Sequence, residues 1–102
     1  MKKTRRRYLL FKLHREGPLI EEKQLSLTIW KSLLLLYGEI QAADSKLYMI
    51  DYNESTGEGI LQCTLHSLQQ VIAAAVVIGE INGTAVSFEP KKTSGTIKGL
   101  NR

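Results

Sequence analysis

Hydrophobic residues alternate in some segments of this chain and recur at helical spacing in others, and these two patterns predict six elements. Four short segments with alternating or branched apolar residues predict strands, at 7–13, 46–52, 59–65 and 84–89. Two longer segments carry apolar residues three and four positions apart and predict helices, at 20–37 and 67–77. The predicted order is strand, helix, strand, strand, helix, strand.

Turn and capping residues set the predicted ends of these elements. Gly38 and Gly79 are expected to end the two helices, and Ser67 is expected to cap the start of the second. Asn82 and Gly83 predict a turn into the last strand, which Pro90 is expected to end.

This order predicts an α+β fold: a ferredoxin-like (RRM-like) βαββαβ sandwich, with a four-stranded antiparallel sheet and two helices on one face. Residues 1–102 would form a single domain with short basic terminal extensions. In this plan the first and third strands are central, and the last strand runs antiparallel beside the first. The start of the first strand then lies next to the end of the last. Asp51, Glu54 and Glu58, around the hairpin, are expected at the opposite end.

Charge is distributed unevenly along the chain, although the formal net charge is only +4. Residues 1–15 carry seven cations and residues 90–102 carry four, with no acidic residue in either segment. The middle carries three lysines and all ten acidic residues. This segregation predicts an anionic partner held by both termini, with two solvated basic tails as the alternative.

Phosphate binding is the chemistry that these terminal segments favour, because cations neutralise phosphates while hydroxyls and exposed N–H groups contact them. The segment 59–65 carries no aromatic residue for base stacking, and Tyr8, Phe11, Tyr48 and Tyr52 are interpreted as core or edge residues. We therefore expect recognition of RNA backbone and shape, with little reading of base sequence. The predicted RNA-binding residues are Lys2, Lys3, Arg5, Arg6, Arg7, Lys91, Lys92, Ser94, Gly95, Thr96, Lys98 and Arg102.

Other chemistries are poorly supported. Two histidines and the single Cys63 do not form a recognisable catalytic set or zinc-ligand spacing, so we expect no catalytic residue, bound metal or bound cofactor in this protein. The motif "SGTIKG" lacks the spacing of a nucleotide-binding phosphate loop. The apolar runs are too short to span a membrane, and a lone cysteine fits a reducing compartment, which predicts a cytoplasmic protein.

Five motifs together resemble the archaeal ribonuclease P protein component 2 family, which has eukaryotic relatives. They cover nearly the whole chain and are "RRYLLFKL" at 6–13, "TIWKSLLLLYGE" at 28–39, "TGEGILQC" at 56–63, "LQQVIAAAVVIGEINGTAV" at 68–86 and "SGTIK" at 94–98. The most specific feature is "SGTIK" just after the last strand combined with "RYLLFK" in the first.

The resemblance implies the ferredoxin-like fold and a role as a non-catalytic subunit of ribonuclease P, the endoribonuclease that removes the 5′ leader from precursor tRNA. It implies that the RNA subunit performs the Mg²⁺-dependent hydrolysis. The implied partners are ribonuclease P RNA, precursor tRNA through the complex, and the TIM-barrel protein component 3, in a complex with two copies of each protein.

Two departures from the family pattern remove positive charge. Gln62 stands where relatives typically carry arginine, and the chain stops at "GLNR" where archaeal members tend to continue into a basic helix. More of the RNA contact should then fall on the N-terminal arginines.

Two alternative functions remain open on the same fold. A ligand-binding regulatory domain would need a glycine-rich loop after the first strand, and "HREGPLI" has one glycine. Acylphosphatase-type hydrolysis would need a phosphate-cradling loop around an arginine, for which Arg15 is the nearest candidate.

Overall fold

The sheet of this protein is built around its first strand. The computed structural model describes residues 5–100 and contains five strands in the order β2-β3-β1-β5-β4, all paired antiparallel. The strands are β1 (Arg6–Glu16), β2 (Tyr48–Tyr52), β3 (Glu58–Thr64), β4 (Glu80–Ile81) and β5 (Thr84–Ser94). The predicted antiparallel sheet is confirmed, with β1 paired to both β3 and β5 as expected.

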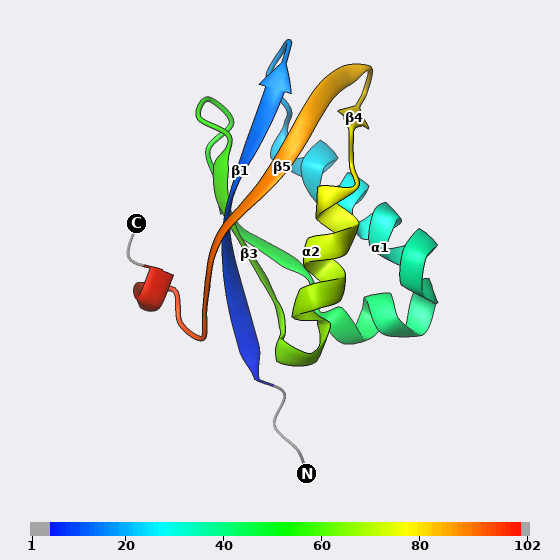
Figure 1. Ribbon diagram of the computed structural model, residues 1–102, viewed down its shortest axis with the longest axis vertical. Coiled ribbons are helices and arrows are strands. Elements are labelled where there is room, and N and C mark those ends of the chain that lie inside the picture. Colours follow the sequence, from blue (N-terminus) through cyan, green and yellow to red (C-terminus); the bar gives the residue numbers. More distant parts are fainter. Residues whose placement is uncertain (1–4, 101–102) are drawn as a thin grey trace.

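Two helices cover one face of the sheet (Figure 1). They are α1 (Glu22–Ser45) and α2 (Leu68–Val76), and a single 3₁₀ turn, η1 (Leu65–Ser67), leads into α2. A second such turn, η2 (Lys98–Leu100), follows β5 and lies on the opposite face. Within residues 5–100, no helix is long and apolar enough to cross a membrane.

The prediction of four strands was wrong, because β4 adds a fifth at the edge beside β5. Asn82 and Gly83 both have positive φ, at 52° and 80°, which is the backbone of a two-residue hairpin turn. The turn was expected, but β4 has only two residues and its pairing is confined to Thr84 and Ala85. So short a strand shows no alternation that a sequence pattern could reveal.

The prediction that Pro90 ends the last strand was also wrong. β5 continues through Pro90 to Ser94, and a register shift opposite Leu10 and Phe11 leaves Lys91 as an extra residue in β5. Beyond Ala85, β5 is an edge strand. Proline is tolerated at edges and bulges, where its missing N–H costs no ladder hydrogen bond.

Two predicted features of the helices differ in the structure. Gly38 leaves the helical region, with φ 88° and ψ 172°, but α1 resumes after this kink and runs to Ser45 instead of ending. Ser67 precedes α2 as predicted, yet it makes no side-chain cap hydrogen bond. Ser67 is the last residue of η1 and has a helical backbone, not the extended one that is usual for an N-cap. Its Oγ instead accepts a hydrogen bond from the Thr64 hydroxyl at 3.1 Å.

The main core lies between the sheet and the helices. Leu9, Phe11 and Leu13 alternate toward the helices as predicted, and the Phe11 ring stacks between Tyr52 and Phe88, at centroid distances of 6.2 and 4.7 Å. A residue larger than glycine does not fit at Gly59, where a Cβ would lie 2.6 Å from Phe11 Cζ. Packing around Phe11 therefore fixes the register of the β2–β3 hairpin against β1.

A second, smaller cluster lies on the other face of the sheet. Leu10 and Ile60 are buried there beneath Leu100, which is only 1% exposed, and Tyr8 and Ile50 pack against them. In Figure 1 the C-terminal turn lies against the sheet on the side away from the helices. Leu100 therefore anchors η2 to a face that the sequence patterns left uncovered.

Candidate nucleic-acid interface

The start of β1 and the end of β5 lie side by side, as the fold prediction required. Tyr8 is opposite Ser94 in the sheet, and η2 packs against both strands. Residues 5–8 and residues 94–100 therefore meet at one end of the sheet, whereas Lys12 lies farther along β1, opposite Glu58 and Glu89. Lys2, Lys3 and Arg102, which were also predicted to bind RNA, lie outside the described residues.

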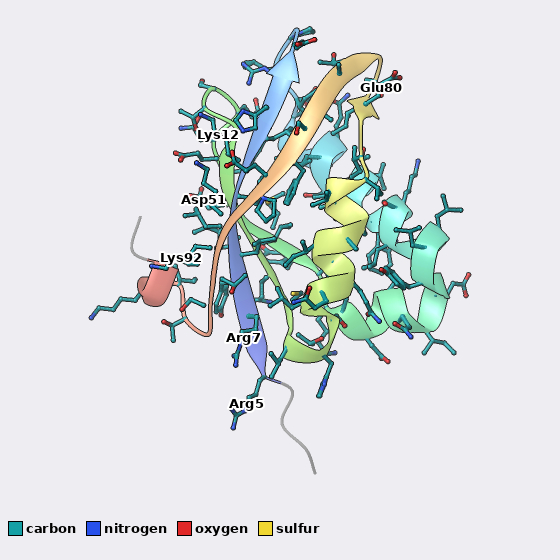
Figure 2. The ribbon with its side chains drawn as sticks, viewed as in Figure 1. Arg5, Arg7, Lys12, Asp51, Glu80 and Lys92 are labelled. Atoms are coloured by element: carbon teal, nitrogen blue, oxygen red, sulfur yellow. The ribbon has the colours of Figure 1, made fainter. Side chains whose placement is uncertain are left out.

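The three consecutive arginines differ in their surroundings. Arg5 and Arg6 are exposed, and the Arg5 carbonyl accepts a hydrogen bond from the Leu65 N–H at 2.8 Å, which ties the chain to η1. Arg7 is half-buried and its Nη1 donates to the Arg6 carbonyl at 2.9 Å. Figure 2 shows Arg5 and Arg7 at the same end of the molecule. None of the three forms an ion pair with a described residue.

Arg7 directly contacts the C-terminal segment. A Cβ added at Gly95 would lie 3.1 Å from Arg7 Nη1, so the guanidinium group lies against the Gly95 backbone. The absence of a side chain at position 95 thus lets the cation approach the loop closely. This contact joins the two segments that the charge distribution singled out.

The "SGTIK" segment forms a compact loop held by its own hydroxyl groups. Ser94 Oγ accepts a hydrogen bond from the Thr96 N–H at 3.2 Å, and Thr96 Oγ1 accepts one from the Gly99 N–H at 2.9 Å. A Cβ at Gly99 would collide with Ser94 Oγ. Since each hydroxyl acts here as an acceptor, its own O–H remains able to donate to a phosphate oxygen.

Sequence reasoning missed Leu100, the residue that holds this loop in place. Its burial against Leu10 and Ile60 keeps η2, and with it the exposed Lys98, beside the sheet. The available signal was one apolar residue in the otherwise polar stretch "KGLNR", which is too weak to predict a buried contact.

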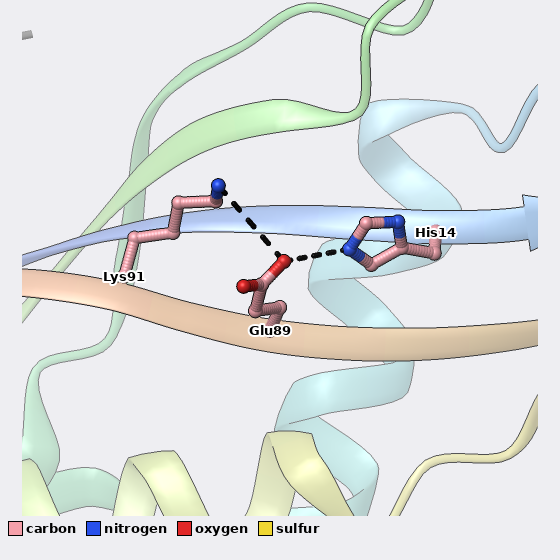
Figure 3. Close-up of polar contacts among 3 residues, drawn as sticks. All are labelled: His14, Glu89 and Lys91. Atoms are coloured by element: carbon pink, nitrogen blue, oxygen red, sulfur yellow. Dashed lines mark hydrogen bonds and ion pairs between the residues drawn. The ribbon is translucent and has the colours of Figure 1, made fainter.

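Lys91 and Lys92 lie within β5 and not in a terminal tail. Lys91 Nζ is 4.0 Å from Glu89 Oε1, and the same oxygen is 2.7 Å from His14 Nε2 (Figure 3). The His14 hydrogen bond and the Lys91 charge hold the pKa of the exposed Glu89 carboxyl below its usual value. Lys92 lies on the open face opposite Leu10 and has no ion pair with a described residue. Lys91 is therefore partly compensated, whereas Lys92 is not.

The acidic residues are less segregated than the sequence indicated. The hairpin turn that contains Glu54 lies near the far end of β1, where the Leu13 N–H donates to the Gly57 carbonyl at 2.8 Å. Asp51 was expected at that end too, but it lies mid-sheet, opposite Ile60 and in line with Lys92. In Figure 2 Asp51 lies between Lys12 and Lys92 along the long axis. The register shift in β2 next to Asp51 contributes one position to this displacement, because it sets Asp51 opposite Ile60 and not Gly59.

The residues proposed for hydrolysis do not form a phosphate cradle. Arg15 lies inside β1 and not in a loop after it, and its buried Nε makes no hydrogen bond with any described group. Among residues 5–100, no three His, Cys, Asp or Glu side chains group so as to hold a metal ion. The chemistry that the arrangement supports best is binding of an anionic polymer.

Comparison with known proteins places this geometry in a family. The sequence model of the Rpp14/Pop5 family matches residues 7–102. The ribonuclease P protein component 2 of Pyrococcus furiosus is 30% identical over 100 residues, covering 98% of this chain and 82% of that protein. The protein of the same name from Thermococcus kodakarensis is 28% identical with the same coverage.

A solved structure shares the fold. One chain of the cryo-EM structure of yeast ribonuclease MRP superposes with a TM-score of 0.69 over 94% of this chain and 78% of that one, at 8% sequence identity. The family model includes the C-terminal basic segment and the N-terminal one from Arg7 onward. This chain belongs to the Rpp14/Pop5 family.

Proposed function

We propose that this protein is a non-catalytic protein subunit of ribonuclease P, which binds the RNA of that complex for removal of the 5′ leader from precursor tRNA. Family membership and the relatives named ribonuclease P protein component 2 support this assignment. In this proposal the chain takes part in an endoribonuclease as one member of a ribonucleoprotein, and the RNA subunit carries out the hydrolysis.

The observation that carries the proposal is the group of uncompensated cations at one end of the sheet. Within the described residues Arg5, Arg6, Arg7, Lys92 and Lys98 form no ion pair with a carboxylate, although they come from two ends of the chain. Cations without protein partners attract phosphates and displace their condensed counterions, which provides affinity that falls as salt rises.

The mechanism is electrostatic. Folded RNA brings phosphates close together, and Mg²⁺ screens their repulsion. Cations that the protein holds in place on the RNA would supply part of this screening, so the complex would need less Mg²⁺. The metal belongs to the RNA subunit in this proposal, and the protein residues bind phosphate oxygens only.

The finer features of the assignment follow from the family resemblance. We assign the fold to the ferredoxin-like class, with β4 as an added edge strand, and the protein to the cytoplasm. The proposed protein partner is the TIM-barrel protein component 3, in a complex with two copies of each. Leu35 and Ile40 of α1, which are 87% and 80% exposed, give the helical face an apolar surface for a protein partner.

A Mg²⁺ titration of the reconstituted enzyme tests the proposal. Replacing Arg5, Arg6 and Arg7 by Ala removes three cations from the interface, so we expect cleavage of precursor tRNA to need a higher Mg²⁺ concentration for half-maximal rate. Saturating Mg²⁺ should restore most of the rate, because the metal then supplies the missing screening.

Single substitutions provide the matched comparison. Arg6→Ala and Lys31→Ala each remove one exposed cation, the first from the interface and the second from α1. Only Arg6→Ala should raise the Mg²⁺ requirement. An unchanged Mg²⁺ requirement in the triple arginine variant would contradict the proposed role of this end of the sheet.

A further inference from the structure

One row of side chains crosses the open face of the sheet near its basic end. The strand register sets Tyr48 of β2, Gln62 of β3, Tyr8 of β1 and Ser94 of β5 opposite one another in turn. Residues directly opposite in antiparallel strands share a face. Leu61 and Cys63, the two neighbours of Gln62 in β3, belong to the helix-facing core, so this tyrosine row lies on the face away from the helices.

The tyrosine row contains an exposed aromatic ring. Tyr48 is 62% exposed, and within residues 5–100 its ring stacks on no other ring. No described group hydrogen-bonds the Tyr48 hydroxyl or the Gln62 amide. Tyr8 is half-buried because it packs against the cluster under Leu100. Tyr48 lies on an edge strand, as the sequence interpretation allowed, and most of its ring is exposed to solvent.

Uncompensated cations lie on both sides of the tyrosine row. Arg6 precedes Tyr8 by two positions on β1, and Lys92 precedes Ser94 by two positions on β5, so both lie on the same face as the row. Leu10 and Ile60 lie in the neighbouring row, and Leu100 covers them. The exposed surface around the tyrosine row therefore ends at Leu100. The ring and the amide are therefore flanked by exposed cations, Arg6 and Lys92, whose charge would attract phosphate.

We propose that the tyrosine row binds an unpaired nucleotide of the RNA, with the Tyr48 ring stacked on the base and the Gln62 amide hydrogen-bonded to the base edge. Aromatic side chains on a sheet face stack with unpaired bases, whereas bases within an RNA duplex are shielded by pairing and stacking. An amide both donates and accepts, which matches the mixed edge of a base. This inference rests on the proposed function and adds base contact to backbone contact.

The neighbouring chemistry favours a nucleotide over a peptide. A peptide that added to the sheet would pair with the backbone of β2 at its edge and would not need side chains on the face. The row instead combines an aromatic ring and an amide with the flanking cations Arg6 and Lys92. Base stacking beside phosphate neutralisation is the combination found in single-strand binding surfaces.

The test is RNA binding by the full-length protein and its Tyr48 variants, measured with the ribonuclease P RNA of its own organism over a range of salt concentrations. Loss of one stacked base should weaken binding about tenfold in Tyr48→Ala. Tyr48→Phe keeps the ring and should bind within about twofold of the wild type. The salt dependence should stay unchanged in both variants, because no phosphate contact is lost.

Two further variants separate loss of the ring from other effects. Tyr48→Leu keeps apolar bulk but removes the aromatic face, so it should bind as weakly as Tyr48→Ala while staying folded. Val77→Ala removes an exposed apolar side chain just after α2, away from every surface assigned above, and should bind like the wild type. Crosslinking by ultraviolet light, followed by mass spectrometry, should join Tyr48 to an unpaired nucleotide.

The outcomes separate this inference from the proposed function. If the wild type binds ribonuclease P RNA no better than 5S ribosomal RNA, the proposed function fails and the ligand named here fails with it. If the wild type is selective but Tyr48→Ala and Tyr48→Leu bind equally well, the tyrosine row is not a base-binding site. RNA binding at wild-type strength combined with lost assembly onto a protein partner would assign the row to that protein and overturn the inference.

Discussion

Individual contacts decide how the basic end of the sheet is built. Arg7 approaches the loop because position 95 has no side chain, and Lys91, the extra residue of the bulge, lies 4.0 Å from Glu89. Two lysines that are adjacent in sequence thus differ in their surroundings: Lys92 has no ion pair with a described residue, whereas Lys91 shares a carboxylate with His14.

The buried thiol of Cys63 gives a prediction for alkaline pH. Burial raises the pKa of this thiol from 9.0 to about 11. As pH rises above 9, the unfolded state loses the thiol proton before the folded state does. The stabilising contribution is therefore fully present below pH 9 and is lost as pH rises through about 11. Urea unfolding across this range should show stability falling with pH.

Comparison with Cys63→Ala isolates the thiol, since the pKa of Tyr52 is also raised, mainly by burial, and contributes in a similar range. The variant should lose less stability than the wild type over the same pH interval. Equal pH dependence in the two proteins would show that the Cys63 thiol titrates normally and is not shielded by the core.

At the scale of elements, η2 is a short turn held to the sheet by one side chain. Leu100 is buried between Leu10 and Ile60, and the hydroxyls of Ser94 and Thr96 close the loop that precedes it. The C-terminal basic segment is thereby fixed beside the N-terminal one. Fixed cations lose less conformational entropy on binding than cations on a tail would.

Leu100→Ala should detach this element. The substitution removes a buried side chain, and we expect a loss of about 2 kcal/mol in unfolding free energy, at the lower end for Leu→Ala because the segment lies near the chain end. Urea unfolding measures this loss, with Lys98→Ala as the matched control in the same turn. Stability equal to that of the wild type would mean that Leu100 does not anchor η2 in solution.

Sequence reasoning predicted the elements whose apolar residues recur with a clear strand or helix periodicity within the element itself. Leu9, Phe11 and Leu13 alternate within β1, and Ile29 and Leu33 lie one turn apart in α1, so local periodicity was sufficient. Pairing with other segments decides the rest. β4 exists only because it pairs with β5, and η2 is held only because Leu100 finds a hydrophobic site on the sheet.

The candidate site was also predictable only in part: strand order predicted its location, but not the neighbours of each side chain. Strand order alone brought the start of β1 to the end of β5, and the structure agrees. The extra position of Lys91 in β5 and the pairing of Asp51 with Ile60 both come from register shifts. A shift of one residue leaves the sequence pattern almost unchanged but moves a side chain to a different neighbour.

At the scale of the whole molecule, three surfaces have different chemistry. One end of the sheet carries uncompensated cations, the far part of the open face carries the compensated group of His14, Glu89 and Lys91, and the helical face carries exposed apolar residues such as Leu35. Such a division suits a subunit that contacts RNA with one surface and protein with another. RNA binding as proposed requires that both ends of the chain form the first surface jointly.

The salt dependence of RNA binding by an Arg6→Ala/Lys98→Ala double variant tests this joint surface most directly. Each lost phosphate contact should lower the slope of log affinity against log salt by about one, so the double variant should lose about two. Lys31→Ala, which removes a cation from α1, should leave the slope unchanged. A double variant with the wild-type slope would contradict the claim that the two ends of the chain bind RNA together.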